Sequence, residues 1–309
     1  MKRFRLSISR GRLLSHSYDI VVFILLVGLS FVFLYPFLHM FSTSLKSYDD
    51  LTDITVKWFP KNLTPSNYAV AFDSLNYLRS FGNSLIVSLT ATVGHILSCS
   101  FIAYGFARFK FPLKKLLFGI LVLAIVVPLP TIIVPQYRMF SSYGVVNQQN
   151  LLDYTAILLP TFFGFGLRGC LFTYLFRQTF IKLPSALEEA AAIDGCNPFK
   201  TFFRIVIPSS GAVILVVAVL SMVWHWNDAY EPNLYIVGEE YFLLPQLLPG
   251  LKAVIDAMSS NPAEPDAIRT YNDAVAMAGT ALAALPMLLM FFTVRNKFMQ
   301  SIERTGLVE

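Results

Sequence analysis

Long apolar runs alternate with short polar segments along nearly the whole of this chain. Six stretches hold close to the ~20 apolar residues that a helix needs to cross a bilayer. They are roughly Ile20–Phe41, Ser84–Tyr104, Leu116–Val134, Thr155–Phe176, Ala212–Trp224 with its flanks, and Ala274–Val294. The pattern predicts an all-α integral membrane protein with six transmembrane helices. Pro128, Pro130 and Pro135 lie near the end of the third stretch, where proline bends or ends a helix.

The composition supports a membrane protein and indicates which partners to expect. Of the 309 residues, 55% are hydrophobic and only 14% are charged, whereas a soluble domain carries about 25% charged residues. The lipid bilayer is therefore the expected surroundings, and the modest net charge of +5 gives no reason to expect a nucleic-acid partner. The three cysteines are far apart, with no paired spacing, so we predict no metal site.

The distribution of basic residues predicts the orientation. With a cytoplasmic N-terminus, sixteen of the 24 Lys and Arg residues fall in segments on the inside and seven in segments on the outside. Short cytoplasmic loops carry an excess of Lys and Arg. We therefore predict that both termini lie inside, and that the polar segment between the fourth and fifth spans lies in the cytoplasm.

That polar segment, "EEAAAIDGCNPFKTFFRIVIP" (residues 188–208), has the pattern of a short helix, a tight turn and a second helix. Ser185 stands three residues before Glu188, a capping-box spacing. Gly195 suits a helix C-terminus, and Asn197 suits the N-cap of the next helix. On propensity alone, an ordinary cytoplasmic connection with good caps explains the segment equally well.

The spacing within the segment is more specific than its propensities. Glu189, Ala190 and Ala191 are followed by Gly195 after three residues, and then by Ile205 and the pair Ile207–Pro208. This resembles the EAA motif of permease subunits of binding-protein-dependent ABC importers, although that family usually has Leu where this chain has Ile207.

Further segments resemble the carbohydrate branch of the family, near its maltose-type second permease. They are "AYGFARFKFP" (103–112), "VPQYRMFSSYGVVN" (134–147), "WNDAYEP" (226–232) and "AGTALAALPMLLMFF" (278–292). The resemblance runs from about Phe81 to the end. The first span looks like a subgroup associated with complex oligosaccharides. We accordingly divide the chain into residues 1–80, with the N-terminal tail, first span and external loop, and residues 81–309, an ABC importer permease core with its EAA loop at 185–208.

The resemblance implies an assembly and a role for the polar loop. Two permease subunits form one pathway, two cytoplasmic ATPase subunits drive it, and an extracytoplasmic solute-binding protein delivers the solute. The EAA helix is a coupling helix that docks on the ATPase. The residues that carry over are Glu189, Ala190, Ala191 and Gly195. Glu188 and Asp194 flank them and are weaker candidates.

The energy source is expected to be a partner chain. None of the 16 glycines is followed by Lys, so the chain has no P-loop to cradle phosphate. We expect no catalytic residue and no cofactor here, with ATP and Mg²⁺ bound by the partner ATPase. A stand-alone secondary carrier is the alternative of another class. It is disfavoured because no Asp or Glu lies deep in the predicted spans.

One charged residue does lie within a span. Arg168 sits in "GFGLRGCLF", and an arginine facing lipid costs a few kcal/mol or more. Its functional interpretation is contact with solute in the pathway. The alternative is an interhelical hydrogen bond, or snorkelling to the membrane surface.

Aromatic and polar side chains after the fifth span are the other candidates for the solute pathway. Sugars stack on aromatic faces, and Trp224 and Trp226 are followed by Asn227 and Asp228. An aromatic belt at the membrane interface is the competing explanation for the tryptophans.

The sequence thus predicts a permease subunit of an oligosaccharide importer, multi-pass in the bacterial inner membrane. An ABC permease for a non-sugar solute, such as a glycerol phosphodiester or polyamine, is the nearest alternative. A structural or regulatory membrane subunit is a third.

Overall fold

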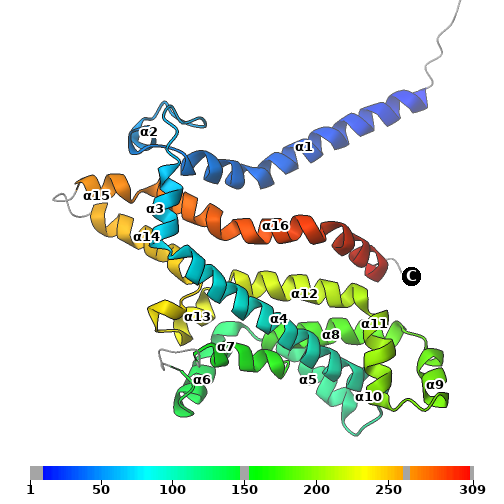
Figure 1. Ribbon diagram of the computed structural model, residues 1–309. Coiled ribbons are helices and arrows are strands. Elements are labelled where there is room, and N and C mark those ends of the chain that lie inside the picture. Colours follow the sequence, from blue (N-terminus) through cyan, green and yellow to red (C-terminus); the bar gives the residue numbers. More distant parts are fainter. Residues whose placement is uncertain (1–9, 147–152, 260–264, 307–309) are drawn as a thin grey trace, which may run out of the picture. The chain divides into compact units, whose positions relative to one another are not determined.

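The computed structural model describes residues 10–146, 153–259 and 265–306, and every regular element in these ranges is helical (Figure 1). The elements up to the polar loop are α1 (Arg10–Ser44), α2 (Tyr48–Thr52), α3 (Ser66–Ser74), α4 (Tyr77–Arg108), α5 (Lys114–Val126), α6 (Leu129–Ser142), α7 (Asp153–Phe162) and α8 (Gly166–Lys182). Those that follow are α9 (Ser185–Ile193), α10 (Pro198–Thr201), the π-helix η1 (Phe202–Val206), α11 (Ile207–Ser209), α12 (Gly211–Trp226), α13 (Tyr230–Tyr235), the 3₁₀ turn η2 (Glu239–Tyr241), α14 (Leu244–Ser259), α15 (Pro265–Thr270) and α16 (Asp273–Gly306).

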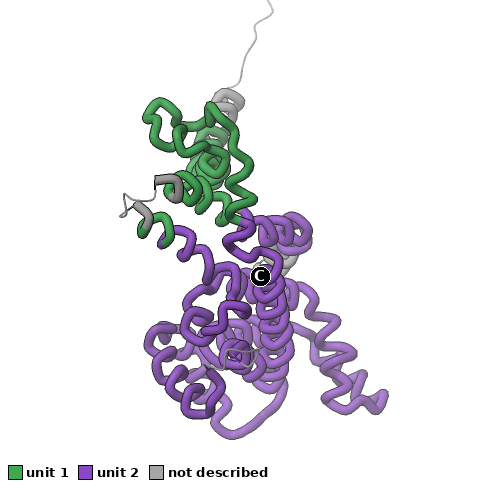
Figure 2. The backbone as a smooth tube through the Cα atoms, turned by 60° about the vertical axis from the view of Figure 1, so that its left-hand side comes forward, with its two compact units in different colours: residues 1–71, 254–281 green, residues 72–253, 282–309 purple. Residues whose placement is uncertain are grey.

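The chain forms two compact units, one from residues 1–71 and 254–281 and one from residues 72–253 and 282–309 (Figure 2). The first unit therefore takes a C-terminal segment as well as the N-terminal part, and its first boundary falls at residue 71. The sequence-based boundary at residue 80 and the EAA loop at 185–208 both lie within the second unit's range.

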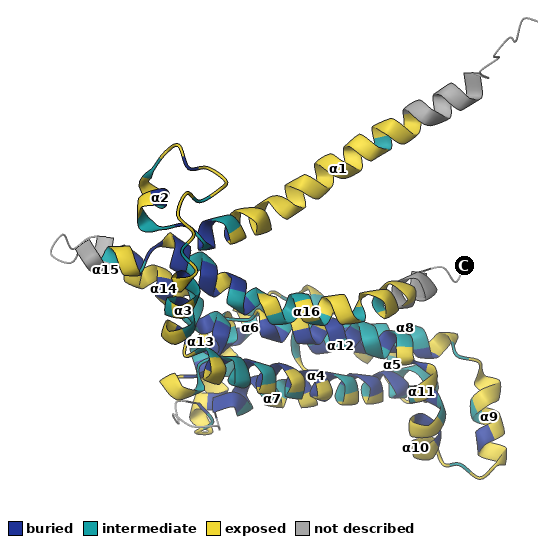
Figure 3. Cartoon of the chain, turned by 45° about the horizontal axis from the view of Figure 1, so that its top comes forward, coloured by how far each residue is buried: buried dark blue, intermediate teal, exposed yellow. Residues whose placement is uncertain are grey.

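In the first unit, polar side chains fix the segment that follows α1. The Lys46 ammonium group is buried and donates to the carbonyl oxygens of Val56 and Lys57 at 3.1 and 2.9 Å. Asn67 donates to the carbonyls of Ser44 and Lys46. These bonds satisfy backbone groups that no regular element pairs. By contrast, α1 itself exposes large apolar side chains along most of its length, as a helix facing lipid does (Figure 3).

In the second unit, α4 is the central helix and packs against α7, α8 and α12, while α5 packs against α8. The packed face of α4 carries small residues, including Gly94 and Ala103, together with Ser88 and Thr92. Small side chains let helix backbones approach closely, which is how helices associate where lipid removes the hydrophobic driving force.

Within the described ranges, four helical segments are long and apolar enough to cross a membrane. They are Tyr18–Ser44, Tyr77–Arg108, Asp153–Lys182 and Asp273–Gln300. Two bent pairs raise the number to six if each pair is one span: Lys114–Val126 with Leu129–Ser142, and Pro198–Ser209 with Gly211–Trp226. The chain is an all-α protein with several membrane helices, and the six-span count and its orientation stay predictions.

Both bends have local causes. The axes of α5 and α6 meet at 104°, and Pro128 is the N-cap residue of α6, so the predicted effect of proline in this stretch is confirmed. The fifth predicted stretch, Ala212–Trp224, lies wholly within α12, but the flank before it does not continue this helix, because α12 begins at Gly211 and lies at 79° to the helices before it. At 1.5 Å per residue, α12 is about 24 Å long, shorter than the ~30 Å hydrocarbon core.

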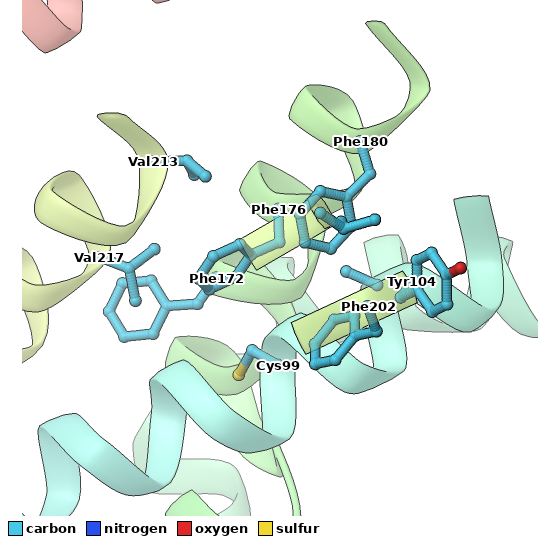
Figure 4. Close-up of a cluster of buried hydrophobic side chains, with 10 residues drawn as sticks. Cys99, Tyr104, Phe172, Phe176, Phe180, Phe202, Val213 and Val217 are labelled. Carbon is cyan, nitrogen blue, oxygen red and sulfur yellow. The ribbon is translucent and has the colours of Figure 1, made fainter. Parts of the chain in front are cut away.

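A π-helix leads from the polar loop into this bend. Within η1 the Ile207 N–H donates to the Phe202 carbonyl, five residues back. Pro208 has no N–H to continue an α-helical ladder, which accounts for the wider turn. Phe202 itself is fully buried, in a cluster that joins α4, α8, η1 and α12 (Figure 4). The cluster holds Cys99, Ala103, Tyr104, Phe172, Phe176, Phe180, Phe202, Val206, Val213 and Val217.

Candidate functional site

The turn between α9 and α10 has the geometry that its sequence predicts. Gly195 has φ +77°, in the region that favours glycine. The Cys196 N–H donates to the Ala191 carbonyl and the Gly195 N–H to that of Ala192, which is a Schellman motif. Asn197 caps α10 by accepting from the Lys200 N–H at 2.8 Å. Nothing lies within 4 Å of a Cβ added at Gly195, so backbone conformation and not crowding requires glycine there.

The predicted capping box at the start of α9 does not form. The N-cap residue is Pro184, which makes no side-chain cap. Glu188 instead accepts from Arg108 Nε at 2.6 Å and from the Tyr104 hydroxyl at 3.2 Å. Arg108 also donates to the Leu183 carbonyl at 2.8 Å. Arg108, at the end of α4, thus holds Glu188 and fixes α9 there. Local sequence rules do not predict such a long-range contact.

The remaining predicted coupling residues differ in exposure. Glu189, Ala190, Asp194 and Gly195 are exposed, whereas Ala191 is buried. Large apolar side chains share this surface: Ile193 is 87% exposed and Phe199 is 63% exposed. The α9–α10 loop (residues 185–201) therefore presents acidic and apolar groups together, and Glu189 rather than Glu188 is the glutamate that a second protein can reach.

A buried charge cluster lies at the other candidate site. Arg168 Nη2 is 2.5 Å from Asp228 Oδ2, and Arg168 Nη1 is 3.4 Å from Glu231 Oε2. The guanidinium lies over the Trp224 ring, 5.5 Å from its centroid. The three charged side chains are at most 15% exposed. Arg168 therefore makes the interhelical bond that was the alternative to contact with solute.

A tight backbone turn positions Arg168 in the first turn of α8. Gly164 and Gly166 both have positive φ, +61° and +78°. A Cβ on Gly169 would stand 2.2 Å from the Gly164 carbonyl oxygen, so a side chain at this position cannot be accommodated. The glycines on either side of Arg168 thus allow α7 and α8 to join without a long loop, and they turn Arg168 toward α12 and α13.

The carboxylates have their own supports. Asp228 Oδ1 accepts from the backbone N–H groups of Tyr230 and Glu231, at 2.9 and 3.3 Å, where α13 begins. Burial raises the pKa of Glu231, the Arg168 charge opposes that rise, and the nearby Asp228 carboxylate adds to it. Two carboxylates therefore share one arginine.

This cluster borders a cavity of ≈ 140 Å³ in the second unit. Its polar lining includes His95, Gln136, Thr161, Arg168, His225 and Glu231, with the Trp224 ring beside them. His95 Nδ1 lies 3.0 Å from Ser221 Oγ, and His225 Nδ1 lies 2.9 Å from the Ser221 carbonyl oxygen. One nitrogen of each ring is thus engaged within the protein.

Of the predicted pathway residues, Arg168, Trp224 and Asp228 come together. Asn227 lines a shallower hollow beside Asp228, and its amide donates to the Val223 carbonyl. Trp226 is buried and donates its indole N–H to the Ala283 carbonyl at 3.0 Å, away from this cavity.

Sequence reasoning missed Glu231, His95 and His225. Glu231 stands three residues after Asp228, and this short spacing between two carboxylates was the available signal. Nothing in the sequence links His95 to His225, 130 positions later. No group of three or more His, Cys, Asp or Glu side chains able to hold a metal occurs among the described residues.

Comparison with known proteins decides the family. The model of the family described as "Binding-protein-dependent transport system inner membrane component" matches residues 96–304. The chain belongs to this family. It is thus a multi-pass inner-membrane permease component of an ABC importer, and the predicted resemblance and localisation are confirmed. Members act with a solute-binding protein, a partner permease and ATPase subunits, and they are not themselves the enzyme.

Individual relatives cover most of the chain. It is 25% identical over 281 residues to the arabinooligosaccharides transport system permease protein AraQ of Halalkalibacterium halodurans, covering 90% of this chain and 92% of AraQ. It is 31% identical over 221 residues to the sn-glycerol-3-phosphate transport system permease protein UgpE of Pectobacterium atrosepticum, covering 71% and 70%. A chain of a bacterial ABC transporter involved in import of the acidic polysaccharide alginate has the same fold, with a TM-score of 0.75, 21% identity and coverage of 94% and 98%.

Proposed function

We propose that this chain is a permease subunit of an ATP-driven importer for an oligosaccharide, with both termini in the cytoplasm. Family membership supports the importer, and the relative named for arabinooligosaccharides, aligned over 90% of the chain, supports the solute class. The excess of Lys and Arg in the segments on the inside supports the orientation. The chain forms the translocation pathway with a second permease, receives solute from an external binding protein and is driven by two ATPase subunits.

The α9–α10 loop is the proposed coupling element, and its contacts provide the route into the spans. Glu189 and the exposed apolar side chains dock on the ATPase. Motion of the loop then acts on α4 through the Arg108–Glu188 ion pair. It also acts on α8 and α12 through Phe202, which lies in their shared core (Figure 4). The exposure of Glu189 beside the internally bonded Glu188 is the observation that carries this part of the proposal.

The proposed solute pathway runs past the cavity that Arg168, Trp224 and Glu231 border. An aromatic face beside charged and amide groups is suited to a sugar ring with its hydroxyls. Arg168 bonds internally, so its contribution is to hold the carboxylates and the Trp224 face in place.

ATP hydrolysis by the complete reconstituted importer tests the proposal. We expect oligosaccharides, delivered by the binding protein, to stimulate ATPase activity. We expect Glu189→Lys to abolish this stimulation, and Gly195→Val to weaken it, while the chain still inserts in the membrane. Stimulation by sn-glycerol 3-phosphate and by no saccharide would instead establish the non-sugar alternative. Full stimulation in either variant would contradict the docking of α9.

A further inference from the structure

The charged cluster that borders the cavity beside Arg168 holds more carboxylates than cations. Among the described residues that line it, Arg168 is the one Lys or Arg, and both carboxylates of the cluster contact its guanidinium. The charge of Arg168 is therefore already offset by two carboxylates, so Arg168 offers little net attraction to a further anion. The cluster of Arg168, Asp228 and Glu231 carries one excess negative charge when both carboxylates are ionised, and it is largely screened from water.

The two carboxylates are not equivalent. Asp228 is the better satisfied of the two, because it accepts the short bond from Arg168 and two backbone N–H groups at the start of α13. Glu231 lies 3.4 Å from the guanidinium, longer than the 2.7–2.9 Å usual for a charge-assisted bond, and its other partner is the Asp228 side chain. Glu231 also lines the cavity, whereas Asp228 lines a second hollow, which Trp224 borders as well. Glu231 is thus the carboxylate with acceptor capacity toward a solute.

Such a site favours one class of sugar. A carboxylate is acceptor-only when ionised, so its natural partners are hydroxyl donors. At pH values above the raised pKa of Glu231, a uronate carboxylate brought near this side chain would meet a like charge where water screens poorly. The one cation that offsets that charge is already engaged.

The geometry points to Glu231 as the residue that sets the charge class of the solute: this cavity accepts uncharged, hydroxyl-rich sugars and rejects sugars that carry carboxylates. This inference rests on the proposed oligosaccharide function. It separates the chain from the transporter of its structural relative, which is involved in import of an acidic polysaccharide.

Binding to the complete membrane complex in nanodiscs, without the external binding protein, tests the inference. Leaving that protein out removes its own selectivity from the measurement. The probes are neutral arabino-, malto- and cello-oligosaccharides, oligogalacturonates of matched length, and sn-glycerol 3-phosphate, followed by saturation-transfer NMR. We expect at least one neutral series to bind about tenfold or more better than the uronates, a ratio that corresponds to ~1.4 kcal/mol.

Glu231→Gln keeps the size and shape of the side chain and removes the excess charge. We expect it to reduce the neutral-to-uronate ratio severalfold, while Glu239→Gln, an exposed glutamate eight residues later, leaves the ratio unchanged. Uronates that bind wild type as well as neutral sugars, or an unchanged ratio in Glu231→Gln, would overturn the inference and leave the proposed function standing. Binding of glycerol phosphate and of no saccharide would overturn both.

Discussion

The α9–α10 loop and the Arg168 cluster use the same kinds of side chain in opposite ways. In the loop, Glu188 is bonded to Arg108 while its neighbour Glu189 is exposed. In the cluster, Arg168 bonds two carboxylates and all three side chains are nearly buried. An exposed charge costs little to leave without an internal partner, whereas a buried one costs several kcal/mol. The loop can therefore keep groups ready for another protein, and the cluster cannot.

The largest expected effect on stability comes from removing the shared arginine. Arg168→Ala leaves Asp228 and Glu231 buried beside each other without a counter-charge. We expect a loss of ~3–5 kcal/mol in the free energy of unfolding, measured by SDS titration of the purified complex. Arg138→Ala removes an exposed arginine from α6 and should change little. Equal losses of stability in Arg168→Ala and Arg138→Ala would show that the buried cluster is no more sensitive to the loss of a charge than an exposed site.

The Arg108–Glu188 ion pair, which fixes α9 to α4, should contribute less to the free energy of unfolding than the Arg168 cluster. Arg108 and Glu188 are 19% and 18% exposed, and a hydrogen bond between charged groups contributes ~1.5–3 kcal/mol. We expect Arg108→Ala and Glu188→Gln each to destabilise by about that amount. A double-mutant cycle should give a coupling energy above ~0.5 kcal/mol. Strictly additive effects would show that the pair does not hold α9.

The turn at Gly195 should respond to backbone preference and not to size. Gly195→Val places a β-branched residue at positive φ, which costs ~1–2 kcal/mol, although its Cβ meets no neighbour. We expect solute-stimulated ATPase activity to fall severalfold. Gly195→Asn, whose side chain tolerates this conformation, should retain most of it. If both variants lost activity equally, the surface at Gly195 and not its φ would be what matters.

The smallest effect on stability is expected at Glu189. Because the side chain is exposed, Glu189→Lys should change the free energy of unfolding by no more than ~0.5 kcal/mol. Its effect on function should be large, with loss of solute-stimulated ATPase activity. Marked destabilisation by Glu189→Lys would mean that the side chain has an internal partner, as Glu188 does.

Local features were predictable from the sequence and long-range ones were not. Gly195, Asn197 and Pro128 determine the backbone within a few residues, so the turn, the cap and the bend could be predicted. Glu188 illustrates the limit: its spacing from Ser185 indicated a capping box, but Arg108, 80 positions earlier, bonds it instead. The cavity likewise depends on α4, α8, α12 and α13 meeting, which no local pattern encodes.

Cross-linking to the ATPase subunit tests the central claim most directly, namely that α9 faces its partner through Glu189 and not through Glu188. Single cysteines at positions 188 and 189 would be introduced in a Cys196→Ser background, because Cys196 lies partly exposed in the same loop. In the complete complex, we predict that a short cross-linker with a maleimide at one end and an amine-reactive ester at the other joins Glu189→Cys to a lysine of the ATPase, and that Glu188→Cys stays unlinked. Efficient cross-linking from position 188 alone, or from neither position, would contradict the account.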